Sequence, residues 1–308
     1  MTLAGSPYND SNAKSLAKTQ LENILNYSVA NGDKYWAPTL DEWRKQWMPS
    51  TDYYNKYSIF AIQHRTNENR NYLIFNFSPG LPPSYTSRRI FGNSIWVEKT
   101  LEYEFERTFS NGKKDGRGIG FTILEGYEEE PNYPAYTNDR ENVILEDGTT
   151  VEVYTKTMFY KYLPSKPKLA ELGMSFDESS MAGDYDWPVN FPILRLEDMM
   201  LLYAELLADE GNVVEAMYYV NKIRERAGCD PETASTSADA LRLIKRERRV
   251  ELAGEGIRWF DLVRYGEWQS AITRMFDNYN NPDGTDKSEL KNGRYLYPIP
   301  LDQMNAVP

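Results

Sequence analysis

The feature that most constrains the fold of this chain is residues 193–276, where apolar residues recur at the spacing of an α-helix and glycines interrupt the pattern. Apolar residues three and four apart lie on one side of a helix, and glycine is a common helix terminator. One apolar face ends at Gly211 and a second follows directly. The stretch therefore predicts a pair of helices joined by a tight turn, then a third helix over residues 237–254 and a fourth over 257–276.

Small residues beside the first turn refine this prediction. Ala204, Gly211 and Ala216 stand at the offsets that are typical of tetratricopeptide-like helix pairs. Residues 13–30 also show helical spacing, and residues 57–63 combine β-branched and aromatic residues as a strand does. We therefore expect a mainly α fold, with a tetratricopeptide-like helix-hairpin scaffold.

The middle of the chain has a different character. Clusters of Pro, Gly, Asn and Asp separate short apolar runs, which indicates turns and loops. The runs that could form strands are residues 72–77, 121–124, 151–155 and 157–162. Long irregular segments are often functional. We expect three parts: a helical segment with a short strand over 1–63, a loop-rich, ligand-facing subdomain over 64–190, and a helical region over 191–308.

Charge and composition exclude several classes of function. The formal net charge is -11 and the sequence pI is about 4.9, so the chain repels phosphate backbones and we expect no nucleic-acid partner. With one cysteine, Cys229, and one histidine, His64, the chain offers neither a cysteine-based zinc cage nor a supported Ser-His-Asp triad. We expect no metal and no cofactor, and the alternative that stays open is a loose calcium site with oxygen ligands from Asp283 and Asp286. No run approaches the ~20 apolar residues of a membrane helix.

Charged residues are concentrated at the end of the third predicted helix and the start of the fourth. They are Glu247, Arg248, Glu251, Glu255, Arg258, Asp261 and Arg264. Their spacing lets each carboxylate meet a guanidinium on the same helix or across the break at residues 254–256. We interpret the set as a structural charge network that locks two helices and the terminal Pro-Ile-Pro turn together. The alternative is a pair of catalytic carboxylates, as in a glycosidase, but its acid needs a raised pKa, and neighbouring arginines lower the pKa.

Aromatic residues are the clearest excess in the composition, since 23 Tyr, 7 Trp and 12 Phe make up 14% of the chain. Three loop segments combine them with polar side chains. This combination suits sugars, whose C–H faces pack on rings while their hydroxyls need polar partners. The candidate ligand-binding residues are Tyr85, Arg88, Asn93 and Trp96 in the first segment, Tyr127, Tyr133 and Tyr136 in the second, and Trp187 in the third.

Three stretches that follow one another in a fixed order resemble the C-terminal signature of a known family. The matching residues include Tyr203-Ala204-Glu205, Arg226-Ala227-Gly228, Glu247-Arg248-Arg249, Arg264-Tyr265-Gly266 and Pro298-Ile299-Pro300. On these residues the chain resembles the SusD/RagB-like outer-membrane nutrient-binding lipoproteins of Bacteroidota. The resemblance is strongest over the last third of the chain and weakest in the middle.

The resemblance implies a non-enzymatic protein on the surface of the outer membrane. Such a protein binds oligosaccharides and delivers them to a SusC-like TonB-dependent transporter, and a lipid anchor holds it to the membrane. The chain carries neither the signal peptide nor the lipid-attachment cysteine of the family, so we expect a shortened member. Two alternatives stay open: a protein-interaction scaffold without a ligand site of its own, and a glycoside hydrolase.

Overall fold

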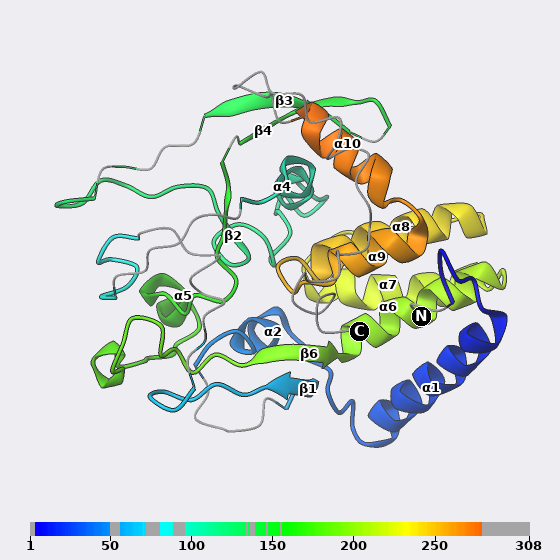
Figure 1. Ribbon diagram of the computed structural model, residues 1–308, viewed down its shortest axis with the longest axis horizontal. Helices are drawn as coiled ribbons and strands as arrows, with labels where there is room; N and C mark the ends of the chain where they lie inside the picture. Colours follow the sequence, from blue (N-terminus) through cyan, green and yellow to red (C-terminus); the bar gives the residue numbers. More distant parts are fainter. Residues whose placement is uncertain are drawn as a thin grey trace, which may run out of the picture. The chain divides into compact units, whose positions relative to one another are not determined.

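The mainly helical fold is confirmed in the computed structural model of the protein (Figure 1). The structure describes residues 4–49, 56–69, 71, 81–88, 96–133, 135, 139–145, 147–154 and 156–278. The chain forms two compact units: a larger one, Leu16–Gly256, and a smaller one that combines Met1–Ser15 with Ile257–Pro308. The three-part division at residues 63 and 190 stays a prediction.

Helices dominate the described part of the chain. They are α1 (Ser11–Ala30), α2 (Leu40–Lys45), α4 (Lys99–Glu106), α5 (Lys166–Glu171), the short 3₁₀ helix η1 (Glu178–Ser180), α6 (Leu196–Asp209), α7 (Val213–Arg226), α8 (Ser237–Glu251), α9 (Arg258–Tyr265) and α10 (Trp268–Asn278). The strands pair antiparallel, two by two: β1 (Ser58–Ile62) with β6 (Phe191–Arg195), β2 (Ile123–Leu124) with β5 (Met158–Phe159), and β3 (Arg140–Ile144) with β4 (Thr150–Tyr154). None of the described helices is both long and apolar enough to cross a membrane.

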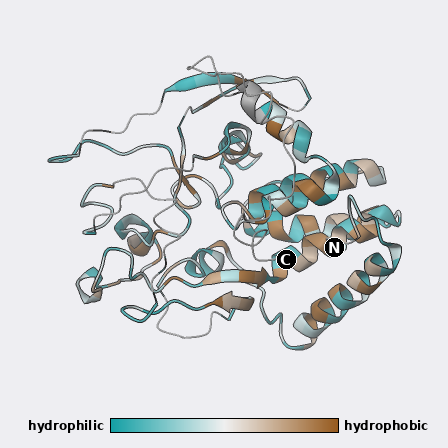
Figure 2. Cartoon of the chain, in the orientation of Figure 1, coloured by the Kyte–Doolittle hydropathy of each residue, from teal (hydrophilic) through white to brown (hydrophobic). Residues whose placement is uncertain are grey.

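Helices α6 and α7 form the predicted hairpin, and α8 packs against both (Figure 1). Gly211 adopts a φ of +86°, a left-handed conformation that glycine tolerates and that ends the first helix. Ala204 and Ala216, the small residues beside the turn, are both fully buried. Hydrophobic and hydrophilic residues alternate along the helical ribbons (Figure 2), as expected for helices that bury one side.

Three helix boundaries differ from the prediction. The first helix of the hairpin begins only at Leu196, because residues 191–195 form β6 and pair with β1. The third helix ends at Glu251, short of the predicted end. The fourth, predicted as one helix over 257–276, is the two helices α9 and α10, because Gly266 takes a φ of +71° and terminates α9.

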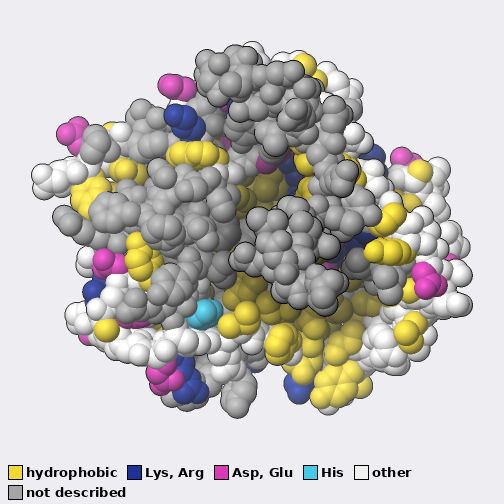
Figure 3. Space-filling model, in the orientation of Figure 1, with side chains coloured by type: hydrophobic (Ala, Val, Ile, Leu, Met, Phe, Trp, Pro, Cys, Tyr) yellow, Lys and Arg dark blue, Asp and Glu magenta, His cyan; other side chains and the backbone are white. Residues whose placement is uncertain are grey.

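The ribbon of β1 and β6 exposes apolar side chains. Phe60 is 57% exposed and faces Leu194, which is 39% exposed. Ile62 and Ile193 add two more large exposed side chains, and hydrophobic side chains gather at the lower centre of the surface in Figure 3, over this ribbon. We call these four residues the apolar ribbon face.

The other strands follow the prediction unevenly. Those expected at residues 121–124, 151–155 and 157–162 appear as β2, β4 and β5, two of them shortened to a pair of residues. The sequence did not indicate β3, which pairs with β4 across a turn in which Gly148 has a φ of +84°. The strand expected at residues 72–77 lies outside the described residues.

Much of the aromatic excess belongs to a buried core. The rings of Trp43 and Trp47 lie 6.0 Å apart, and Trp47 meets Tyr162 edge to face at 5.3 Å. Trp187 is 0% exposed in the same cluster, and its ring lies 5.7 Å from that of Phe176. Edge-to-face pairs of this kind stabilise a core beyond the area that they bury.

The smaller unit is built around α9 and α10. The rings of Trp259 and Trp268, one on each helix, lie 6.2 Å apart. The N-terminal segment joins the same unit, because the backbone N–H of Ser6 donates to the carbonyl of Arg264 at 2.8 Å. A Cβ at Gly5 would lie 2.6 Å from the same carbonyl oxygen, so this close approach requires glycine.

Candidate functional site

Glu251, at the end of α8, lies at the centre of a buried array of charges. One of its carboxylate oxygens accepts from Arg117 at 2.7 Å and from Arg226 at 2.8 Å. The other accepts from Arg195 at 3.0 Å and from the indole N–H of Trp43 at 2.9 Å. A buried carboxylate is tolerated only when such partners replace its water.

The array extends through further buried pairs. Arg117 also lies 2.6 Å from Glu247, and Arg195 lies 2.8 Å from both Glu197 and Glu255. We call the whole set the arginine–carboxylate network; its members are Asp115, Arg117, Lys161, Arg195, Glu197, Arg224, Arg226, Glu247, Glu251 and Glu255. It ties the loop at residues 115–117 and strand β6 to helices α7 and α8.

The partners differ from those that helical spacing suggested. The predicted carboxylates Glu247, Glu251 and Glu255 pair with cations from distant segments rather than with neighbours on the same helix. Arg248 binds Asp198 at 2.7 Å. The last predicted pair lies in the smaller unit, where Arg264 binds Asp261 at 2.8 Å.

For two parts of the predicted charge network, the pairing stays a prediction. Arg258 is the first residue of α9, in the smaller unit. The Pro-Ile-Pro turn lies outside the described residues.

The electrostatics of this array suit structure rather than acid catalysis. Burial alone raises the pKa of Glu251, but the guanidinium groups of Arg226, Arg195 and Arg117 outweigh it and hold the pKa well below its ordinary value. A glycosidase acid needs the opposite shift and contact with substrate. Glu251 has a lowered pKa and is 0% exposed, so it offers neither the raised pKa nor the contact with substrate.

The same shift predicts acid sensitivity. A carboxyl whose pKa is lower in the folded than in the unfolded chain adds stability above the unfolded pKa, about 4.3, and loses it as pH falls through the folded pKa. We expect the contribution of Glu251 to the free energy of unfolding to be constant from about pH 7 to 5 and to fall below about pH 4.5, measured by urea titration. Glu251→Gln removes the titrating group and should flatten this acid loss. An unchanged acid slope in that variant would contradict the assignment.

A cavity of about 610 Å³ lies at a second place, between two of the predicted aromatic loops. It is lined by Ser84, Tyr85, Gly126, Tyr127, Glu128, Glu129 and Glu130, and we call it the tyrosine cavity. The rings of Tyr85 and Tyr127 lie 6.1 Å apart and are inclined by 59°, so they present two partly exposed aromatic surfaces at one opening. The glutamates supply acceptors at its edge.

Contacts behind the cavity position its two rings. The Tyr85 ring packs edge to face on buried Tyr160, with 6.1 Å between the ring centres, and the backbone N–H of Lys166 donates to the Tyr85 carbonyl at 2.8 Å. The two loops meet where the N–H of Ser84 donates to the carboxylate of Glu130 at 3.3 Å. Backbone hydrogen bonds in both directions then pair Glu130 with Tyr133, each at 2.9 Å.

Burial raises the pKa of both cavity tyrosines. For Tyr85 the charges of Glu130 and Glu128 add to the effect of burial, and for Tyr127 the neighbouring Tyr133 does so. Both hydroxyls therefore stay protonated at neutral pH and can donate hydrogen bonds as well as accept them. This is the chemistry that a polyhydroxylated ligand requires.

The structure brings together three of the predicted ligand-binding residues, Tyr85, Tyr127 and Tyr133, and places others elsewhere. The guanidinium of Arg88 donates to the backbone carbonyls of Glu178 and Met181, which ties it to η1.

Trp96 forms an isolated β-bridge with Met158 and packs against the core. Trp187 is fully buried and its indole N–H donates to the carbonyl of Asp184 at 3.1 Å, so its ring offers no surface to a ligand and we correct that assignment. Asn93 and Tyr136 lie outside the described residues.

Sequence reasoning overlooked the acidic residues beside the aromatic ones. Glu128, Glu129 and Glu130 are adjacent in the same segment, and this run was the available signal. A second cavity, of about 630 Å³, lies along α10 in the smaller unit and is lined by Gly266, Gln269, Ser270, Thr273 and Arg274. Since these lining residues include no aromatic ring, the tyrosine cavity is the better candidate for a sugar.

Comparison with known proteins identifies relatives of this fold. The sequence model of the SusD family matches residues 46–308. The SusD-like protein P38 of Formosa agariphila is 32% identical over 143 residues, which cover 42% of this chain and 28% of that protein. A SusD homolog from Bacteroides thetaiotaomicron has a similar structure, with a TM-score of 0.63 at 17% identity, covering 99% of this chain and 59% of that one.

A further solved structure, surface glycan-binding protein A from Bacteroides thetaiotaomicron, gives a TM-score of 0.60 at 20% identity and covers 96% of this chain and 58% of that one. At such identities the two solved structures show the fold alone. This chain spans less than two thirds of either solved chain and of the curated relative. Because the family match extends over most of the sequence and the folds agree, the chain belongs to the SusD family.

Proposed function

We propose that the protein binds oligosaccharides, without turning them over, at the tyrosine cavity. The observation that carries this proposal is the pairing of Tyr85 and Tyr127 from two separate loops at one opening of about 610 Å³. Each ring can stack on the C–H face of a sugar unit, while the tyrosine hydroxyls and the glutamates beside them hydrogen-bond to its hydroxyl groups. The low pKa of Glu251 and the absence of exposed surface on it support binding rather than hydrolysis.

The charge of the cavity favours neutral sugars. Glu128 and Glu129 are exposed and Glu130 is partly exposed at its rim, which repels the carboxylates and sulfates of acidic glycans. A neutral oligosaccharide meets no such repulsion and finds acceptors for its hydroxyls. Membership of the SusD family and structural similarity to a surface glycan-binding protein support this ligand class.

The cellular setting belongs to the same proposal. We place the protein at the cell surface, on the outer membrane, where a lipid anchor holds it and where it delivers its ligand to a SusC-like TonB-dependent transporter. The support is membership of the family. Co-purification of the membrane-anchored protein with a TonB-dependent transporter tests this part, and purification of the protein alone under conditions that preserve such complexes would contradict it.

Tyr127→Ala is expected to weaken oligosaccharide binding about tenfold, because it removes one stacking surface worth about 1.5 kcal/mol. The measurement is calorimetric titration with the best hit from a panel of neutral β-glucan, cello-, xylo- and malto-oligosaccharides, with sulfated and uronate-containing glycans for comparison. Tyr127→Phe should keep most of the affinity, since it keeps the ring.

The matched control is Tyr218→Ala, which removes a tyrosine that is 59% exposed on α7. Equal loss of binding in Tyr127→Ala and Tyr218→Ala would argue against the tyrosine cavity. Product release from any glycan of the panel would favour the hydrolase instead.

A second candidate function is a protein-interaction scaffold, and the apolar ribbon face favours it. Exposed apolar side chains gathered on one surface mark contact sites in many proteins. This alternative predicts a folded protein that binds no glycan of the panel.

A further inference from the structure

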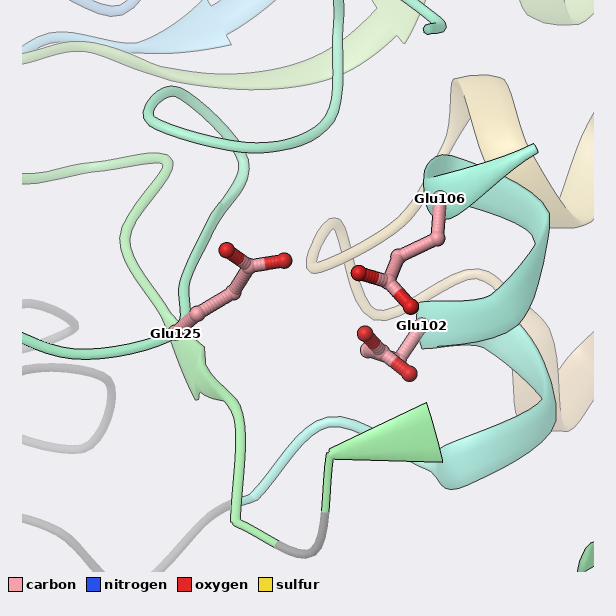
Figure 4. Close-up of side chains that lie close together, drawn as sticks. All are labelled: Glu102, Glu106 and Glu125. Carbon is pink, nitrogen blue, oxygen red and sulfur yellow. The ribbon is translucent and has the colours of Figure 1, made fainter. Parts of the chain in front are cut away.

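Three carboxylates lie close together, one of them two residues before Tyr127 in the sequence (Figure 4). Glu102 and Glu106 lie one turn apart on α4, and Glu125 follows β2 directly. Each residue offers one oxygen, and these three oxygens all lie within 4.8 Å of one another. We call these residues the carboxylate cluster. Like charges so close together are unfavourable unless something between them compensates.

Glu102 gives a second and independent indication that the carboxylate cluster needs a further partner. Its side chain is 0% exposed, and its Oε1 has no hydrogen-bond partner among the described residues. From the described part of the chain its Oε2 receives only the N–H of Tyr154, at 3.3 Å. Figure 4 shows its carboxylate beside that of Glu106, on the side facing Glu125. An ionised oxygen that is buried without a partner is costly, so this geometry calls for a partner inside the cluster.

In the part of the chain that the structure describes, the neighbouring cations form ion pairs with only one of the three carboxylates. Arg140 binds Glu106 through two hydrogen bonds, at 2.9 and 3.0 Å, and Lys114 lies 3.4 Å from the same residue. Glu102 receives no guanidinium or ammonium group among the described residues, and the Oε1 of Glu125 is buried without a hydrogen-bond partner there.

We propose that Glu102, Glu106 and Glu125 bind a divalent cation, Ca²⁺, and that this ion fixes the start of the loop that carries Tyr127. The second part rests on the proposed function. The donor set consists of oxygens alone, which suits Ca²⁺ rather than zinc or copper. Ligand oxygens of Ca²⁺ lie at roughly 2.4 Å from the ion, so three oxygens within 4.8 Å of one another can share it. Glu106 and Glu125 are partly exposed, so water can complete the coordination.

Because of the position of Glu125, an ion bound to the carboxylate cluster would also affect the loop that carries Tyr127. Glu125 stands two residues before Tyr127 and directly before Gly126, the first residue of its segment that lines the tyrosine cavity. An ion shared with α4 would tie this segment to a helix whose own N-terminus is capped by Glu98, which accepts from the N–H groups of Thr100 and Leu101. A ligand loop held in place loses less entropy when the sugar binds.

The test is titration of the full chain, freed of metal with EDTA and dialysed, with CaCl₂ alone. We expect one saturable site with a Kd of about 10⁻⁵ to 10⁻³ M, weaker binding of Mg²⁺, and a rise in Tm of about 5 °C at saturating Ca²⁺. Glu125→Gln and Glu102→Gln should each weaken Ca²⁺ binding at least about tenfold. If Glu102→Gln does not fold, Glu125→Gln decides alone.

Glu104→Gln is the matched control, since Glu104 lies on the same helix but binds Arg107 at 2.9 Å. Its affinity for Ca²⁺ should match that of the parent protein. Absence of saturable binding in the folded parent protein overturns the cation site, and so does an equal loss in Glu104→Gln and Glu125→Gln, which would reflect surface charge alone.

The link to the sugar site is tested separately, by titrating the same oligosaccharide in Ca²⁺ and in EDTA. A several-fold weaker affinity in EDTA supports the link, and an unchanged affinity overturns it while Ca²⁺ binding itself stands. If Ca²⁺ binds and no oligosaccharide does, the proposed function fails and the cation site does not.

Discussion

Replacing Glu251 with alanine is expected to lower the free energy of unfolding by about 3–5 kcal/mol. The substitution leaves Arg117, Arg195 and Arg226 buried without the carboxylate that all three contact, and it removes the acceptor of the Trp43 indole. An unpaired buried charge costs far more than the pair contributes while it is intact. Urea denaturation followed by circular dichroism measures the loss.

The control for this variant is a surface pair. Lys18 and Glu210 lie 2.6 Å apart, but their side chains are 29% and 41% exposed. Glu210→Ala should therefore cost less than about 1 kcal/mol. Comparable losses in Glu251→Ala and Glu210→Ala would show that the arginine–carboxylate network does not stabilise the fold as its burial suggests.

Trp187→Ala is expected to cost about 3–5 kcal/mol of stability, as truncation of a large core side chain typically does. The indole is fully buried and packs beside Phe176, so its loss leaves a cavity, and the carbonyl of Asp184 loses its donor. Tyr127→Ala, at the edge of the tyrosine cavity, should cost less than about 1 kcal/mol while it weakens sugar binding. Thermal and chemical unfolding of both variants, with glycan titration of each, provides the comparison.

Two opposite effects distinguish a core residue from a ligand residue. Truncating the core residue lowers the stability, whereas truncating the ligand residue weakens sugar binding. Trp187→Phe keeps an aromatic ring in the core, so it should recover much of the stability and bind oligosaccharide with the parent affinity. If Trp187→Phe folds as stably as the parent and loses sugar binding, Trp187 contacts the ligand after all and our correction is wrong.

The helical part of the fold was predictable because its signal is local. Apolar residues at helical spacing and glycines at the turns predicted α6, α7 and α8 with their order. Where the prediction was wrong, a distant partner or one backbone torsion was the cause. Residues 191–195 became a strand because β1 lies beside them, and Gly266 divided the last helix.

The candidate site was predictable only in part, because the residues next to a side chain in the sequence do not show whether that side chain is buried. Tyr127 and Trp187 both stand in loops rich in aromatic and polar residues. From the sequence, both were candidates for binding a sugar. The first lines a cavity and the second is fully buried. Packing of residues far apart in the chain makes this difference.

The family, the helix-hairpin scaffold and the residue types that could recognise a sugar follow from the sequence alone, because motifs, helical periodicity and side-chain chemistry are properties of short stretches. Which residues contact one another depends on how distant parts of the chain pack together. Arg117 reaches Glu247 across a separation of 130 residues, Tyr85 meets Tyr127, and Glu125 joins two glutamates of α4. Spacing along a helix indicates which side chains share a face, but long-range packing sets which charges are paired, which rings stay exposed and which carboxylates converge.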